Sequence, residues 1–166
     1  MKRVILLAAI ATGVGVAAII GVSQSGVGSA DVNGVKIPAA VLPKLAKLAH
    51  QWSLREGDRS PSSVLAVRTT RFDALRLADP ADRIPRSRGQ AVYLVVETGR
   101  FTPRGIAAPP GWAPSSQPNL VLILDAKTLA ILDYGVGGRG VHAPRVTLKM
   151  LQGLGPVSRL VSHARN

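Results

Sequence analysis

The sequence predicts an α+β domain behind an apolar N-terminal segment, with one helix packed on a roughly four-stranded antiparallel sheet. One stripe of apolar residues at helical spacing occurs near the start of this domain, at 38–55. Four runs rich in apolar and β-branched residues follow it, and most of the connections between them are short, which favours antiparallel neighbours. With 166 residues, 46% hydrophobic residues and no cysteine, the chain can form one core without a disulfide framework.

The N-terminal segment, residues 1–30, has the features of an export signal. Basic residues precede an uncharged run of 19 residues at 4–22, and the small residues at 28–30 fit a signal-peptidase site. The run also reaches the length of a membrane-spanning helix. Two outcomes stay open, a signal peptide cleaved after Ala30 or a retained anchor. Both predict an extracytoplasmic protein, either secreted or anchored to the cytoplasmic membrane.

A short linker, 31–37, leads into the predicted helix at 38–55. Pro43 must lie in the first turn of this helix, because an interior proline removes a backbone hydrogen bond and clashes with the preceding turn. The apolar stripe consists of Val41, Leu42, Leu45, Leu48, Ala49 and Trp52.

The β-branched run at 62–70 predicts the first strand. Thr70 and Asp73 have the spacing of a capping box, so a short helix should follow the strand. Pro80 should end that helix, and the polar residues at 80–89 indicate a loop.

The run at 90–102 is the clearest strand, and its nearly continuous apolar pattern predicts a central strand covered by the helix at 38–55. A Pro/Gly-rich loop at 103–118 follows it. Two further strands, 119–124 and 129–136, should form a hairpin around a tight turn that begins at Asp125. The domain then ends at 136, and the basic segment 137–166 should be a partly ordered tail.

Several short patterns in this part of the chain occur in one order: the apolar run at 92–96, Gly99, Phe101-Thr102, a Pro/Gly-rich loop, the LILDAKT run at 122–128, and Leu132-Asp133. Over about residues 62–136 this order resembles the small PepSY-like proteins that bacteria export. Leu129 stands where that family usually has glycine after the threonine of the turn, which leaves the form of the turn open. The resemblance implies a helix packed on an antiparallel sheet outside the cytoplasmic membrane. It also implies a non-catalytic role, as a restraint on secreted peptidases, a sensory module or an interaction module.

The residues do not form a recognisable catalytic, metal or cofactor motif. Gly135 to Gly140 match a dinucleotide-binding glycine pattern, but no acid follows Asp133 to bind the ribose. The three histidines are far apart in the sequence. His50 lies in the predicted helix, and His142 and His163 lie in the basic tail, where positive charge opposes cation binding. We therefore predict that the protein is not an enzyme and has no cofactor and no metal site.

Glu97 is the one unusual acid, because it lies in the most apolar strand. We expect it to form a cross-strand ion pair with Arg68 or Arg100. Turn chemistry explains Asp125 and Asp133.

The formal net charge of +12 is the strongest remaining signal. An exported protein meets anionic lipid headgroups, wall polymers and acidic proteins, and nucleic acid is not an expected partner. Two functions stay open, a protein-interaction or regulatory module in the cell envelope, or an electrostatic binder of anionic envelope polymers or lipid headgroups. A compositional bias without any binding role also accounts for the charge. The candidate interaction surface consists of Arg100, Phe101, Arg104, Trp112, Arg139 and Arg145. Two positions stay open for Trp112, which either contacts a partner or folds back over the sheet.

Overall fold

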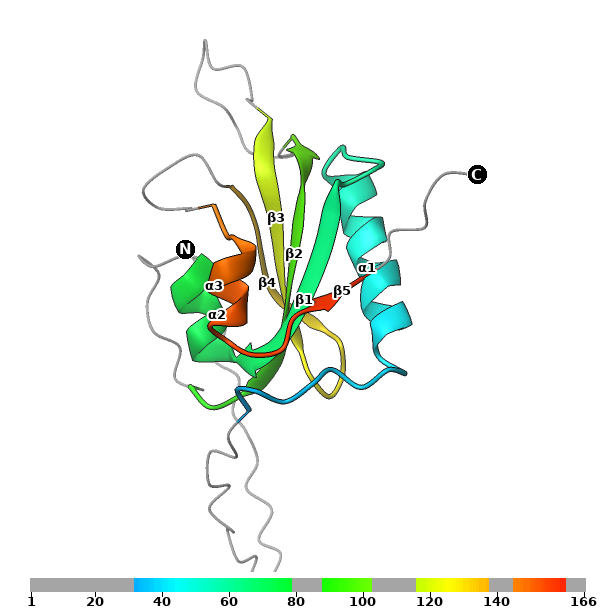
Figure 1. Cartoon of the computed structure of the whole chain (residues 1–166). Helices are drawn as coiled ribbons and strands as arrows, with labels where there is room; N and C mark the ends of the chain where they lie inside the picture. The colour runs from blue at the N-terminus through cyan, green and yellow to red at the C-terminus, as the bar shows by residue number, and fades with distance from the viewer. Residues whose placement is uncertain (1–31, 79–87, 103–115, 138–144, 161–166) are drawn as a thin grey trace, which may run out of the picture.

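The computed structural model describes residues 32–78, 88–102, 116–137 and 145–160. Within them, five strands form one antiparallel sheet in the spatial order β4-β3-β2-β1-β5 (Figure 1). The predicted α+β class is confirmed, and the sheet has one strand more than expected. The apolar run at 4–22 lies outside the described residues. Among those that are described, no helix is long and apolar enough to cross a membrane.

Helix α1, Leu42–Arg55, covers one face of the sheet. It begins four residues after the expected start at Pro38, and this places Pro43 in the first turn, where its missing N–H costs no helical hydrogen bond. Leu45, Ala49 and Ser53 recur every four residues and are buried, as the side of a helix that faces a sheet should be.

Strand β1, Ser63–Thr70, leads directly into helix α2, Arg71–Ala78. The predicted capping contact is present, because the Asp73 backbone N–H donates to Thr70 Oγ1 at 3.2 Å. The Thr70 hydroxyl in turn donates to Asp73 Oδ2 at 2.7 Å. This local exchange explains why the helix starts immediately after the strand.

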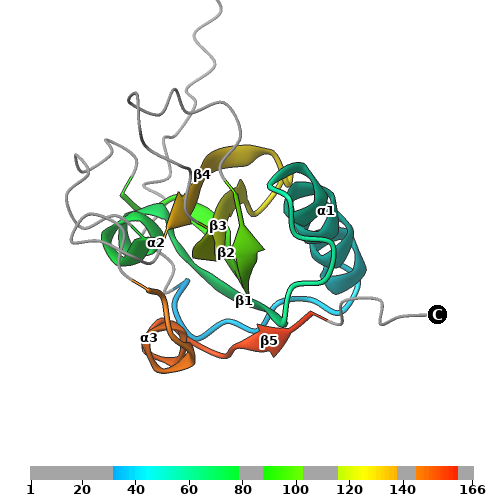
Figure 2. The same cartoon turned by 90° about the horizontal axis from the view of Figure 1, so that it is seen from above.

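Helices cover both faces of the sheet, as the view from above shows (Figure 2). The central strands β2, Ala91–Phe101, and β3, Gln117–Asp125, are therefore apolar on both sides. The α1-side cluster contains Ile37, Leu45, Ala49, Val64, Ala66, Tyr93, Val95, Phe101, Leu120, Leu122, Leu124 and Leu160. The opposite cluster, packed under α2 and α3, contains Val67, Ala74, Leu75, Val92, Leu94, Val96, Val121, Ile123, Val146 and Leu151.

The predicted hairpin joins β3 to β4, Ile131–Gly137. Asp125 stands at the start of the turn, and the Leu129 backbone N–H donates to the Asp125 carbonyl at 2.9 Å. Leu129 has a φ of 60°, in the left-handed region that usually holds glycine. The turn thus keeps a glycine-type conformation although the residue is leucine.

The segment expected to be a partly ordered tail contributes two elements, helix α3, Leu148–Gln152, and strand β5, Ser158–Arg159. Strand β5 pairs with β1 at Leu65 and Ala66. The α1-side cluster thus extends to Leu160 and the opposite cluster to Leu151, both beyond the expected boundary at 136.

Candidate functional site

The candidate interaction surface from the sequence is only partly described by the structure. Arg100 and Arg145 are exposed, and they lie on different elements, the end of β2 and the segment before α3. Phe101 is fully buried and belongs to the α1-side cluster, so its expected place on the surface is wrong. Alternate residues of a strand point to opposite sides, and Phe101 points inward where Arg100 points outward. The other three residues, Arg104, Trp112 and Arg139, lie outside the described residues.

A partly exposed cluster of two aromatic rings and one arginine lies where α1 meets β4. The ring centroids of Trp52 and Tyr134 are 4.5 Å apart with a tilt of 51°. The Arg55 guanidinium lies 4.6 Å from the Trp52 ring centroid and 6.0 Å from that of Tyr134. Tyr134 is 52% exposed, and the Arg55 side chain is 61% exposed. We call these three residues the aromatic–arginine cluster. Tyrosine, tryptophan and arginine are the residue types that most often dominate binding energy at protein interfaces.

The cluster borders the open edge of the sheet. Strand β4 is the last strand on its side, and among the described residues no strand pairs with its outer edge. The other edge strand, β5, is only two residues long. An unpaired strand presents backbone donors and acceptors to which another chain can add a strand. The edge and the cluster together form the candidate functional site.

Sequence patterns did not reveal this cluster, because Trp52 and Tyr134 are far apart in the chain. Trp52 was expected only as part of the apolar stripe, and it does pack partly against the α1-side cluster. Tyr134 faces the same side because it pairs with Leu122 of that cluster. The one sequence signal was the hairpin register, because the turn at Asp125 decides which residues of β3 and β4 pair and therefore which face Tyr134 occupies.

Glu97 is the only described carboxylate with a raised pKa, and it lies beneath α1. Its side chain is fully buried, and its expected ion pair with Arg68 or Arg100 is absent from the described contacts. The register explains this, because Glu97 faces Val64 on β1 whereas Arg68 faces Tyr93. Burial raises the pKa of Glu97 to about 7, a hydrogen bond from Ser53 opposes the rise, and the nearby charge of Asp58 adds to it.

The Ser53 hydroxyl has one hydrogen but two acceptors within reach, Glu97 Oε2 and the Ala49 carbonyl oxygen at 3.2 Å. Donation to Glu97 Oε2 favours the charged carboxylate, which is why this contact opposes the rise in the pKa of Glu97. Ser53 and Glu97 have the residue types of a nucleophile and its base. Both are fully buried, however, so a substrate cannot reach them.

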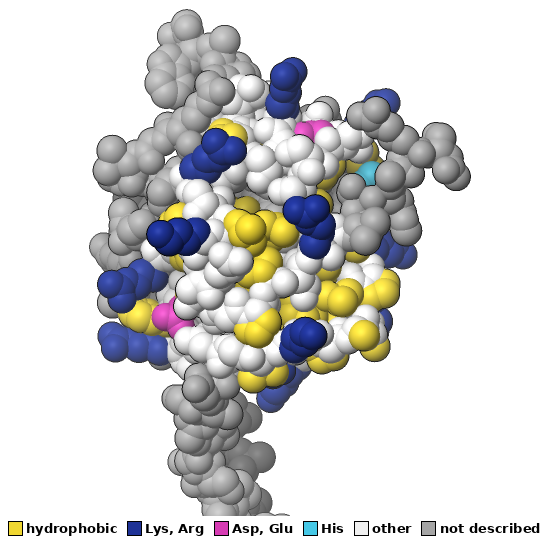
Figure 3. All heavy atoms as spheres, in the orientation of Figure 1, with side chains coloured by type: hydrophobic (Ala, Val, Ile, Leu, Met, Phe, Trp, Pro, Cys, Tyr) yellow, Lys and Arg dark blue, Asp and Glu magenta, His cyan; other side chains and the backbone are white. Residues whose placement is uncertain are grey.

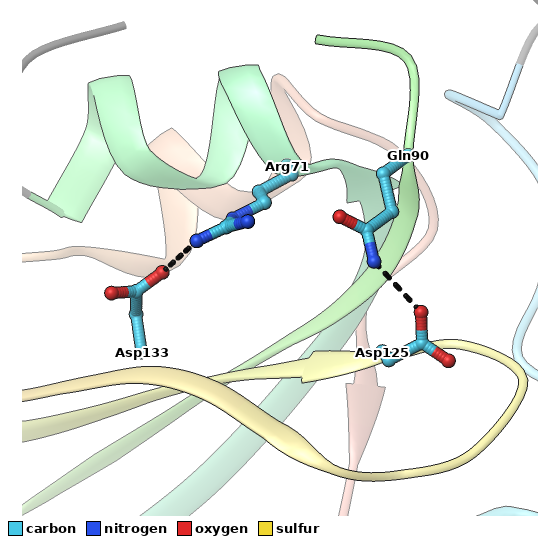
Figure 4. Close-up of polar contacts among 4 residues, drawn as sticks. All are labelled: Arg71, Gln90, Asp125 and Asp133. Carbon is cyan, nitrogen blue, oxygen red and sulfur yellow. Dashed lines mark hydrogen bonds and ion pairs between the residues drawn. The ribbon is translucent and has the colours of Figure 1, made fainter. Parts of the chain in front are cut away.

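A set of polar contacts ties the hairpin to the start of α2 and β2 (Figure 4). Arg71 pairs with Asp133 at 2.9 Å, and the Gln90 amide donates to Asp125 at 2.8 Å. The backbone N–H of Thr128, followed by Gln90, lowers the pKa of Asp125 to about 2. Asp125 serves the turn as predicted, whereas Asp133 lies within β4 and forms an ion pair instead of a turn contact.

The described residues contain no group of three acids and histidines placed to bind a metal ion. Comparison with protein-family models, with curated proteins and with solved structures finds no match for this chain. The similarity to PepSY-like exported proteins therefore stays a prediction.

Proposed function

We propose that this protein is an exported, non-catalytic interaction module of the cell envelope that binds an extended segment of a partner protein along β4. The observation that carries the proposal is the open edge of β4 beside the aromatic–arginine cluster. A partner strand would gain backbone hydrogen bonds from the edge and side-chain contacts from the cluster. Trp52 and Tyr134 offer large contact areas, and Arg55, held over both rings, favours an acidic side chain on the partner.

The sequence at 1–30 supports a place outside the cytoplasmic membrane, because it combines an uncharged run of 19 residues with a signal-peptidase pattern. The buried position of Glu97 supports a non-catalytic role, since it is the one carboxylate with a raised pKa among the described residues and it has no access to solvent. Asp125 is committed to the hairpin turn by its hydrogen bonds to Lys127 and Thr128.

The experiment is to bind the purified protein to isolated envelopes over a salt series and to identify retained proteins by mass spectrometry. We expect one partner to be enriched and to stay bound at several hundred millimolar salt. Replacing Trp52 or Tyr134 by alanine should weaken its binding by about tenfold or more, as loss of an interface anchor does. Leu54→Ala is the matched control, because Leu54 is an exposed apolar residue of the same helix. Equal binding by wild type and both aromatic variants would overturn the proposal.

An electrostatic binder of anionic envelope polymers or lipid headgroups is the second candidate. The observation that favours it is the segment 145–160, which carries Arg145, Lys149 and Arg159 and no acid. In the same salt series this function predicts release without an enriched protein, because salt screens exposed charges.

A further inference from the structure

A shallow groove lies between α3 and the edge formed by β1 and β5. Its volume is about 570 Å³. Leu65, Leu148, Pro156 and Val157 provide its apolar lining, and Gln152 and Arg159 complete it. Leu148 is 48% exposed, and Met150 of the same short helix is 36% exposed. Leu148 therefore adds exposed apolar surface to the apolar lining of the groove.

Positive charge surrounds this groove, which we call the basic groove. Arg159 lines it, Lys149 follows the lining residue Leu148, and Arg145 precedes the same helix; Lys149 and Arg145 are exposed. In Figure 3, hydrophobic side chains occupy the middle of this face, Lys and Arg side chains lie around them, and acidic side chains are few. An apolar centre with a cationic rim matches the interfacial region of an anionic bilayer, where phosphates lie above acyl chains.

The basic groove also lies beside the point where the chain arrives from its N-terminal segment. Gly155, another lining residue, packs so closely on Gly34 that an added Cβ would lie 2.9 Å from the Gly34 nitrogen. Gly34 is 12 residues beyond Val22, the end of the apolar run. A connection of that length spans at most about 40 Å when fully extended. A membrane anchor at 4–22 would therefore hold the basic groove close to the bilayer.

We infer that the basic groove docks the domain on an anionic phospholipid bilayer. Arg145, Lys149 and Arg159 bind headgroup phosphates, while Leu148 enters the boundary between headgroups and acyl chains. This surface is separate from the β4 edge, so the inference does not depend on the protein partner proposed above. It names the anionic ligand that the second candidate function leaves open.

The test uses the full-length chain in nanodiscs of phosphatidylcholine with or without phosphatidylglycerol. Amide hydrogen exchange is measured over residues 146–160. We expect these amides to exchange more slowly on the anionic discs, and this protection to vanish in the double variant Lys149→Gln/Arg159→Gln. Lys44→Gln/Lys47→Gln removes the same number of charges and is the matched control, because both lysines are exposed on α1, which covers the other face of the sheet. Lys47→Gln alone is the control for each single groove substitution. The double control is tested first. It should keep the protection, and so should Tyr134→Ala, which alters an exposed residue of the proposed partner site.

A second measurement follows vesicle binding by the chain 31–166, which retains every residue of both core clusters. Its cooperative thermal unfolding is checked first. Each of the two groove substitutions should lower the partition constant roughly fivefold, as expected for one cation near an anionic surface. Leu148→Ser should weaken binding without changing its salt dependence.

Three results would overturn the inference. The first is equal protection on both kinds of disc, and the second is an equal loss in Lys47→Gln and the groove variants. The third is protection of residues 146–160 by a soluble acidic peptide but not by anionic vesicles, which would make the groove a peptide site.

Discussion

Glu97 lies near the middle of β2 and Asp125 at the end of β3, and folding moves their pKa values in opposite directions. Asp125 pairs with Val92, five positions along β2 from Glu97. The Glu97 carboxylate is buried beneath α1 and receives a hydrogen bond from Ser53, and its pKa rises to about 7. The Asp125 carboxylate receives hydrogen bonds from Gln90, Lys127 and Thr128, and its pKa falls to about 2. The number of donors facing each carboxylate, weighed against its burial, decides the direction of the shift.

The largest effect should come from Glu97→Gln. Glu97 binds its proton more tightly in the folded chain than in the unfolded chain, whose pKa is near 4.5. The free energy of unfolding should therefore fall by about 3 kcal/mol as the pH rises from about 4.5 to about 8. The glutamine keeps a polar group opposite Ser53 but has no charge. The free energy of unfolding of the variant should therefore not decrease over this pH range, and the variant should be more stable than wild type at pH 8. Urea denaturation across this pH range measures both curves, and parallel curves would contradict the assignment.

Asp125→Ala should have the next largest effect, with the opposite pH dependence. Because the folded-state pKa is below the ordinary value of 3.8, the carboxylate stabilises the fold above that pH and loses this contribution as the pH falls toward 2. Losing its charge-assisted hydrogen bonds should cost about 2 kcal/mol near neutral pH. Thermal unfolding at pH 6 and at pH 2 tests the difference. Lys127→Ala is the control, since Lys127 contributes only its backbone N–H to Asp125, and an equal loss there would point to general damage of the turn.

Ser53→Ala should sharpen the contrast at a smaller cost. The substitution removes the hydrogen bond that lowers the pKa of Glu97, so that pKa should rise above 7. The stability cost should be about 1 kcal/mol. The carboxyl carbon of Glu97 can be titrated by NMR, and an unchanged midpoint would show that the Ser53 contact has no influence on the proton.

Leu129→Gly should have the smallest effect. Glycine relieves a left-handed backbone conformation that costs roughly 1 kcal/mol for an ordinary residue, but it also removes a side chain packed partly against the α1-side cluster. The two effects oppose each other, so the change in stability should stay within about 1 kcal/mol. The pKa of Asp125 should stay near 2, because the donors at Gln90, Lys127 and Thr128 remain. An NMR titration of Asp125 that moves toward 3.8 would show that this turn needs leucine.

Sequence patterns predicted the elements that local chemistry determines. The stripe of α1, the Thr70–Asp73 cap and the turn at Asp125 each depend on residues within a few positions of one another. Residues 146–154 were expected to form at most one or two helical turns, and residues 158–159 were not expected to form a strand, because both segments are short and lie among glycines and a proline. Strand β5 exists only through its pairing with β1, almost a hundred residues earlier in the chain.

The candidate site was harder to predict for the same reason. The aromatic–arginine cluster joins α1 to β4, and the Glu97–Ser53 contact joins β2 to α1. Neither contact can be predicted from sequence spacing alone, because both depend on how α1 packs over the sheet. The prediction of an ion pair for Glu97 was wrong because it considered charge complementarity without the strand register. The register places Arg68 opposite Tyr93.

The pairing of β5 with β1 also has a consequence for how the chain folds as it is made. Leu65 meets Arg159 only after 94 further residues have been added to the chain. Contacts between such distant residues form slowly, because a long loop must close first. Until then β1 has a free edge to which a second unfinished chain can add, a common route to aggregation. The five-stranded sheet therefore stays incomplete until residues 158–159 are available to pair with β1.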